Sequence, residues 1–129
     1  MSYNKIKTDP SLGKKVHEYL VSVGVETPVT DNGLSSSEKI NKIEDNFTQI
    51  LDTLGLDLGD DSLINSPKRI AKMYINEIFW GLDYEAFPKA TVVENKMKYN
   101  EMVIVKNISV QSYCEHHFVV IDGLACVAY

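Results

Sequence analysis

The sequence predicts an α+β protein in which the helices come first and the strands last. Apolar residues recur at helical spacing in three segments before Gly81. After Gly81 the segments are rich in β-branched and aromatic residues with partial alternation, which is typical of strands. Because the two kinds of segment lie in separate blocks, the pattern favours an α+β fold over alternating βαβ units.

The first two helices are predicted over residues 13–23 and 36–54. Gly24 ends the first one, because glycine readily adopts the left-handed conformation found after helices. Ser35 and Glu38 have the spacing of a capping box, and one continuous apolar stripe follows them. The second helix therefore begins directly after Ser35.

The third helix is predicted to begin with Ser66 as N-cap and Pro67 in the first helical position, and to end at Gly81. Three strand candidates follow, at residues 90–95, 102–111 and 118–129. The last candidate reaches Tyr129 without a turn residue or a polar tail, so we expect the sheet to be truncated in its middle.

Composition excludes several classes of protein. The chain has 129 residues, of which 44% are hydrophobic and 24% charged, as expected for one globular domain with a core. The net charge of -5 and the lack of a basic stripe argue against nucleic-acid binding. No apolar run approaches the ~18 residues of a membrane span. Two cysteines form no disulfide framework and the N-terminus has no secretory signal, so we expect a cytoplasmic protein.

A cysteine and two histidines fall within four positions of the segment SYCEHHFVVIDG. Thiolate and neutral imidazole are preferred ligands of Zn²⁺, so Cys114, His116 and His117 form a candidate metal site. On a regular strand, Cys114 and His116 share one face and His117 lies on the other. Cys114 and His117 can share a metal only if the polar CEHH segment turns. The spacing leaves both pairings open, Cys114 with His116 or with His117.

The alternative is a solvated loop in which Cys114 is a small buried hydrophobe, but the clustering of three ligand types favours a metal. A structural zinc site takes four protein ligands, and a catalytic site takes three and a water. Cys126 lies between apolar neighbours and is expected to be a core residue of a strand. His17 is expected to be an ordinary surface histidine. The spacing therefore identifies no third ligand.

A second candidate site is a basic cluster, Lys68, Arg69 and Lys72, in the first turns of the third predicted helix. Residues three and four apart share a helix face. Because the helix dipole disfavours cations and favours anions at an N-terminus, the cluster fits a phosphate ligand. The alternative is a solvated face opposite the apolar stripe, and the spacing does not decide between the two.

Longer segments carry a resemblance to a known family. SPKRIAKMYINEIFWGLDYEAFP, ENKMKYNEMVIVKNISVQSYCEHHFVVIDG and VAY resemble GTP cyclohydrolase I, and VHEYLVSVGVETP and LDLGDDSL resemble its bacterial members. The match runs over nearly the whole chain, and the combination of PKRIAKMY with CEHHF is specific. The resemblance implies an N-terminal helical region, residues 1–65, followed over residues 66–129 by a helix and the first strands of a T-fold.

The same resemblance implies a function. Members of the family are zinc enzymes that form toroidal homodecamers and hydrolyse the imidazole ring of GTP, releasing formate and giving dihydroneopterin triphosphate. By motif position, Cys114 and His117 match zinc ligands and His116 matches the acid/base residue. Glu115 lies beside the site. Arg69 and Lys72 match the positions that reach the triphosphate across a subunit interface.

The chain departs from the family in one respect. A second cysteine in a His-x-Cys context, which completes the family's zinc site, has no counterpart before Tyr129, and Cys126 matches a non-ligand strand position. We therefore expect the chain to be part of a cyclohydrolase subunit, with its third zinc ligand beyond Tyr129. The alternative function is that of an inactive subunit, a non-catalytic interaction module of cyclohydrolase rings.

Overall fold

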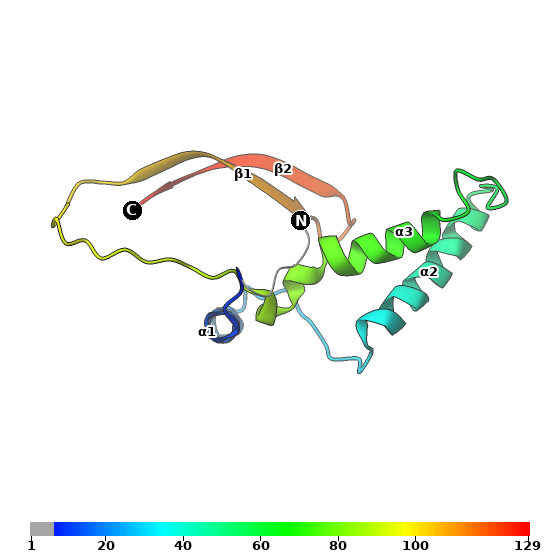
Figure 1. Cartoon of the computed structure of the whole chain (residues 1–129), viewed down its shortest axis with the longest axis horizontal. Helices are drawn as coiled ribbons and strands as arrows, with labels where there is room; N and C mark the ends of the chain where they lie inside the picture. The colour runs from blue at the N-terminus through cyan, green and yellow to red at the C-terminus, as the bar shows by residue number, and fades with distance from the viewer. Residues whose placement is uncertain (1–6) are drawn as a thin grey trace. The chain divides into compact units, whose positions relative to one another are not determined.

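The computed structural model describes residues 7–129, which divide into two compact units. One unit ends at Ala90 and the other runs from Thr91 to Tyr129. Helices make up the first unit and an antiparallel hairpin the second (Figure 1). The predicted α+β class, with helices before strands, is confirmed. The predicted domains, 1–65 and 66–129, stay a prediction.

Helix α1, Pro10–Val23, begins three residues before the predicted start. The side chain of Asp9 caps it, since Oδ1 accepts a hydrogen bond from the Leu12 N–H at 3.0 Å. Pro10 occupies the first turn, where its missing N–H costs nothing. Gly24 ends the helix as predicted, with a left-handed φ of 69°. The Asp-Pro pair is a start signal that the prediction overlooked.

Helix α1 packs against the short 3₁₀ helix η4, Tyr84–Ala86. Gly13 is buried at this contact, where a Cβ atom would lie 1.9 Å from the carbonyl oxygen of Tyr84. The Asp9 N–H also donates to the Phe87 carbonyl at 2.8 Å. Backbone contacts therefore hold the start of α1 against the end of the helical unit.

Helix α2, Ser36–Thr53, begins where its capping box predicts and ends one residue earlier than predicted. The Ser35 N–H donates to Glu38 Oε2 at 2.8 Å, and the Glu38 N–H donates to Ser35 Oγ at 3.4 Å. Both interactions of the predicted capping box are present. This start is therefore determined by local side-chain chemistry.

Helix α3, Ser66–Met73, has Asn65 and not Ser66 at its N-cap position. The predicted N-cap is therefore wrong by one residue. The Arg69 N–H donates to the Asn65 carbonyl at 3.0 Å, so the first helical hydrogen bond closes one residue earlier than expected. Pro67 therefore occupies the second helical position and not the predicted first one, although it still lies in the first turn.

After α3 the helix widens into a π-helical turn, η2, Tyr74–Ile78, followed by the 3₁₀ helix η3, Trp80–Leu82. The Phe79 N–H reaches back five residues to the Tyr74 carbonyl at 2.9 Å. The Tyr74 ring contacts Phe79 and also Phe47 of α2, edge to face, with centroid distances of 5.4 and 5.3 Å. These rings join α2 to the helix that returns beside it (Figure 1).

The second unit is a hairpin of β1, Ile104–Tyr113, and β2, Val120–Ala128. Strands are confirmed at two of the three predicted places. The strand predicted over residues 90–95 is wrong, because this segment pairs with no strand in the described part of the chain. A strand forms only where a neighbouring strand completes its backbone hydrogen bonds, and the composition of a segment does not show whether such a neighbour exists.

A β-bulge interrupts β1. Val105 pairs with Val127 and Ile108 with Ala125, so β1 holds one residue more than β2 over this interval. Asn107 lies at the bulge with a left-handed φ of 58°. Asparagine tolerates this conformation better than most residues.

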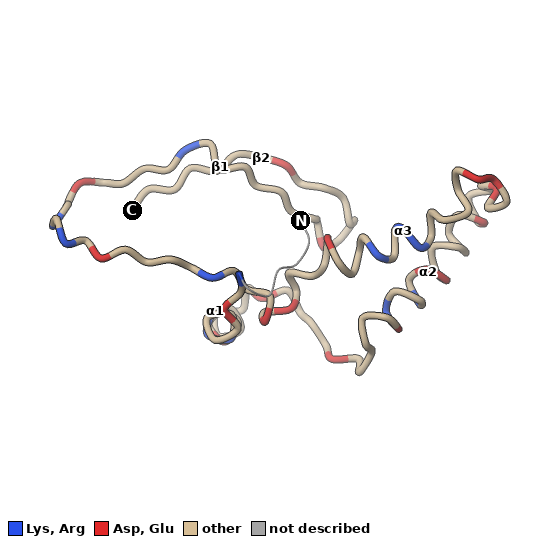
Figure 2. The backbone as a smooth tube through the Cα atoms, viewed as in Figure 1, with Lys and Arg blue, Asp and Glu red and all other residues tan. Residues whose placement is uncertain are grey.

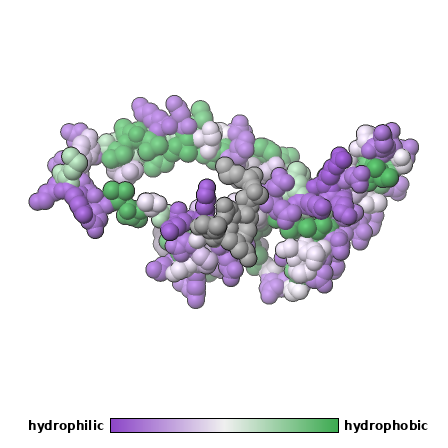
Figure 3. All heavy atoms as spheres, in the orientation of Figure 1, coloured by the Kyte–Doolittle hydropathy of each residue, from purple (hydrophilic) through white to green (hydrophobic). Residues whose placement is uncertain are grey.

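The hairpin exposes most of its apolar side chains, and Figure 3 shows them as a band along both strands. Within residues 91–129 no residue is buried. Cys126 is exposed, so the prediction that it is a core residue is wrong. The physical reason is that residues 91–129 contain two strands and no helix or further strand to pack against them.

Candidate metal centre

The loop between β1 and β2 contains all the predicted metal ligands. Residues 115–117 form a turn, and this confirms the interruption predicted for the CEHH segment. The Cys114 N–H donates to the Val119 carbonyl at 2.9 Å, and the Phe118 N–H donates to the Cys114 carbonyl at 2.9 Å. Two backbone hydrogen bonds therefore close the loop on both sides of Cys114.

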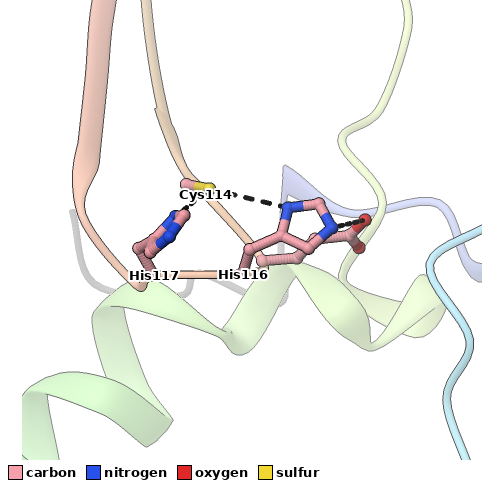
Figure 4. Close-up of polar contacts among 4 residues, drawn as sticks. Cys114, His116 and His117 are labelled. Atoms are coloured by element: carbon pink, nitrogen blue, oxygen red, sulfur yellow. Dashed lines mark hydrogen bonds and ion pairs between the residues drawn. The ribbon is translucent and has the colours of Figure 1, made fainter.

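The turn brings the sulfur of Cys114 close to two imidazole rings (Figure 4). Sγ lies 3.8 Å from Nδ1 of His117 and 3.9 Å from Nδ1 of His116. The two rings are tilted relative to each other, with centroids 6.4 Å apart. The thiol sulfur is therefore about equally far from a ring nitrogen of His116 and of His117, so both pairings that the spacing left open have similar geometry.

These distances fit a shared zinc ion. With bond lengths of about 2.3 Å to sulfur and about 2.0 Å to nitrogen, two tetrahedral ligands lie roughly 3.6 Å apart. The 3.8 Å between Cys114 Sγ and His117 Nδ1 is close to that value. Among residues 7–129, however, no group of three or more Cys, His, Asp or Glu side chains is arranged to hold a metal ion. The described chain therefore supplies a ligand pair.

The electrostatics of the loop favour the thiolate form of Cys114. Hydrogen bonds from His117, with a smaller contribution from His116, lower the pKa of the Cys114 thiol to about 6. The thiolate is the form that binds metals and acts as a nucleophile. A thiol that ionises below neutral pH gives up its proton to a metal at little cost.

Glu115 lies beside His116 in the same turn, with Oε1 3.9 Å from His116 Nε2. Both side chains are mostly exposed, so water screens the pair and its contribution to stability is small. The contact keeps a carboxylate on the side of the His116 ring that faces away from the thiol (Figure 4).

The basic cluster belongs to the other unit. Lys68, Arg69 and Lys72 are exposed on α3, where the cationic residues are visible in Figure 2. The backbone stays helical from Ser66 through the π-helical turn to Ile78, so Lys68 and Arg69 lie in the first turn of this segment and Lys72 lies near its middle. The expected conflict with the dipole therefore concerns Lys68 and Arg69. Within the described chain, no carboxylate lies within ion-pair distance of these three residues.

Two features of the structure escaped the sequence reasoning. Phe118 has a left-handed φ of 53°, for which a bulky aromatic residue gives no sequence signal. His17 is more than a surface histidine, because its Nε2 lies 2.6 Å from Glu26 Oε1 and its ring stacks on Tyr84 at a centroid distance of 4.4 Å. No signal in the sequence links residues so far apart.

The α+β fold and the Cys–His turn define a protein with the ligand chemistry of a transition-metal site. Comparison with known proteins is more specific: residues 43–129 match the sequence profile described as GTP cyclohydrolase I. The chain belongs to the GTP cyclohydrolase I family. The resemblance inferred from its motifs is thereby confirmed.

Individual relatives agree with the profile. The chain is 60% identical over 114 residues to a protein named GTP cyclohydrolase 1 from Aeromonas hydrophila, covering 88% of this chain and 52% of that protein. It is 58% identical over 116 residues to GTP cyclohydrolase 1 of Vibrio cholerae, covering 90% of this chain and 54% of that protein. The chain thus spans about half the length of the curated relatives that it matches.

Proposed function

We propose that this chain is part of a zinc-dependent GTP cyclohydrolase I. The enzyme opens the imidazole ring of GTP by hydrolysis at C8, releases formate and yields 7,8-dihydroneopterin triphosphate, the first step of tetrahydrofolate and pterin synthesis. The observation that supports this best is the 3.8 Å separation of Cys114 Sγ and His117 Nδ1 in a chain of this family. That distance suits two ligands of one zinc ion.

Cys114 and His117 would hold the zinc, with a third ligand from outside residues 7–129. When bound, zinc supplies Lewis acidity that makes water nucleophilic at neutral pH. Cys114 contributes a thiolate, because its pKa of about 6 leaves the sulfur mostly ionised at neutral pH. His117 contributes a neutral imidazole and turns Nδ1 toward the same point as the sulfur.

His116 is the proposed acid/base residue. Histidine exchanges protons near neutral pH, which suits proton transfer to the purine nitrogen and to the sugar. Its Nε2 lies 3.9 Å from the Glu115 carboxylate, and this contact supports a role for Glu115 in orienting the ring and the bound substrate. In this proposal His117 carries the metal and His116 moves protons.

Arg69 and Lys72 are the proposed triphosphate ligands. Their side chains are exposed on α3 and form no ion pair within residues 7–129, so they are available to an anion. The family's architecture makes them contributors to a site in a neighbouring subunit of a homodecameric ring. The net charge of -5 suits a cytoplasmic protein that binds one phosphorylated ligand locally and has no nucleic-acid or membrane partner.

Within residues 7–129, no helix has both the length and the apolar character needed to span a bilayer.

The test is an assay of this chain and of a form extended to the length of its relatives, supplied with GTP and zinc. Dihydroneopterin triphosphate fluorescence and bound zinc per chain are measured together. In the extended form, Cys114→Ala is expected to remove both zinc and turnover. His116→Ala is expected to keep most of the zinc and to lower kcat by at least about 100-fold.

The matched control is Cys126→Ala, which removes the other, exposed cysteine and should leave zinc content and turnover unchanged. Loss of zinc on His116→Ala with retention on His117→Ala would reverse the assigned roles. An extended form that binds GTP and zinc without producing a pterin would overturn the proposal.

A second function is favoured by the exposed apolar side chains of the hairpin. Val110, Ile121 and Leu124 are 43, 55 and 73% exposed, which suits association with other chains. A non-catalytic subunit of cyclohydrolase rings would co-purify with full-length subunits and show no turnover of its own. The same assay therefore distinguishes the two functions.

A further inference from the structure

The loop that carries the metal ligands depends on one residue that is not a ligand. Two backbone hydrogen bonds of 2.9 Å close the loop around its four central residues, 115–118. The Cys114 N–H donates to the Val119 carbonyl, and the Phe118 N–H donates to the Cys114 carbonyl. The second bond spans five residues as an α-turn. For the chain to leave this turn and rejoin β2, one residue must reverse the backbone direction.

Phe118 is that residue. Its φ of 53° places it in the left-handed region, directly after the turn at residues 115–117 and two residues before β2 begins at Val120. Among residues 7–129, two other non-glycine residues share this conformation, Lys98 and Asn107. Asparagine is a common occupant of the region, whereas a bulky aromatic residue there is an outlier. Strained backbone of this kind collects at functional sites, where the surroundings hold it in place.

The reversal at Phe118 has a direct consequence for the ligands. In an extended chain Cys114 and His117 point to opposite faces. With the turn closed, Cys114 Sγ lies 3.8 Å from His117 Nδ1. A backbone that holds this turn by itself would lower the ordering cost of metal binding.

We propose that Phe118 is a positioning residue for the metal centre, acting through its left-handed backbone. This inference rests on the proposed function, since it assigns Phe118 to the Cys114–His117 pair. It goes further by naming the residue whose backbone conformation brings that pair together. Residues that tolerate the left-handed conformation should serve at position 118, and residues with a branched Cβ should not.

The test compares two isomeric side chains in the form extended to the length of its relatives, which includes the proposed third ligand. Phe118→Leu and Phe118→Ile both remove the ring and are equal in composition, but only isoleucine is branched at Cβ and so resists the left-handed conformation. Phe118→Asn removes the ring and favours that conformation. Co²⁺ is the probe, because thiolate binding gives it a charge-transfer absorption that reports the Cys114–metal bond directly.

We expect the Phe118→Asn variant to bind Co²⁺ at least as tightly as the parent, and the Phe118→Leu variant to bind it within about twofold of the parent. The Phe118→Ile variant should bind Co²⁺ more weakly by about fivefold or more. In the metal-free chain, the nuclear Overhauser effect between Cys114 Hβ and the His117 ring should persist in the Leu and Asn variants. In the Phe118→Ile variant this Overhauser effect should weaken, and the backbone amide of residue 118 should exchange its hydrogen faster.

Equal losses in Leu, Asn and Ile would overturn the inference, because they would assign the role to the ring. If the Ile variant does not fold, the Asn variant still decides, since loss of its Overhauser effect contradicts a backbone role. A parent extended form that shows the contact but no thiolate–cobalt absorption would contradict the metal proposal and leave the backbone role of Phe118 standing. The two failures are therefore distinguishable.

Discussion

The sulfur of Cys114 and Nδ1 of His117 lie 3.8 Å apart across a turn of four residues, and this contact sets the reactivity of the thiol. His117 is the main cause of the pKa of about 6 at Cys114. Because the pKa is lowered, the thiolate forms at a lower pH than in a free cysteine, whose pKa is about 8.5.

Alkylation of Cys114 is therefore expected to reach half of its maximal rate near pH 6 in metal-free protein. The measurement is the iodoacetamide rate against pH in a Cys126→Ser background, with a chelator present. His117→Ala should move the midpoint upward toward the value of an ordinary thiol. A midpoint near pH 8.5 in the parent chain, unchanged by His117→Ala, would contradict the contact.

Removing the cations of α3 should weaken GTP binding. Arg69→Ala and Lys72→Ala are each expected to raise the Kd for GTP by about tenfold or more, because a charge-assisted hydrogen bond to phosphate contributes roughly 1.5–3 kcal/mol. Isothermal titration at several salt concentrations measures this effect and its screening. Lys42→Ala, an exposed cation on α2, serves as the control, and an equal loss there would show that only net charge matters.

The contact of α1 with η4 should tolerate no side chain at position 13. In Gly13→Ala the new Cβ would lie 1.9 Å from the Tyr84 carbonyl oxygen, so the helix must shift. We expect the free energy of unfolding to fall by about 2 kcal/mol or more, even after the better helix propensity of alanine. Urea unfolding measures it. In the control, Gly81→Ala, no atom lies within 4 Å of the new Cβ, and a change of similar size would contradict the packing argument.

The start of α2 should depend on its capping box. Ser35→Ala is expected to lower the free energy of unfolding by about 1 kcal/mol, because the Glu38 N–H loses its side-chain acceptor. Ser36→Ala, one position further on, removes a hydroxyl that does not cap the helix and should change little.

The same capping box gives a pH dependence with a definite sign. Hydrogen bonds from Ser35, first from its side chain and then from its backbone, lower the pKa of Glu38 in the folded state. A lowered carboxyl pKa contributes stability above the unfolded pKa of about 4.3 and loses it as pH falls through the folded value. The difference in stability between the parent and Ser35→Ala should therefore shrink below about pH 4. A difference that grows toward low pH would contradict this assignment.

Elements with a local chemical cause were predictable from the sequence. The start of α2 depends on two side chains three residues apart, and the turn at residues 115–117 depends on a polar break in an apolar run. Elements that depend on distant partners were not predictable. Residues 90–95 have the composition of a strand, but a strand exists only where another accepts its hydrogen bonds. The exposure of Cys126 has the same origin, because it depends on how many layers cover the hairpin.

The candidate site was partly predictable for the same reason. Cys114, His116 and His117 are adjacent in sequence, so their convergence needs only a turn. The left-handed backbone of Phe118, which makes the turn possible, cannot be predicted from the residue type. The π-helical turn after Met73, which sets where α3 ends, is likewise not indicated by the apolar spacing.

The bulge near Asn107 has an effect at the far end of its strand. Successive side chains of a strand point to opposite faces of the sheet, so in a regular strand Cys114 would lie on the same face as Ile104. The bulge shifts the register of β1 by one residue, and Cys114 therefore lies on the same face as Val105. The side of the ribbon on which the thiol emerges is thus decided several residues upstream. Deleting one residue of the bulge should turn the ligand pair to the opposite side while leaving its chemistry unchanged.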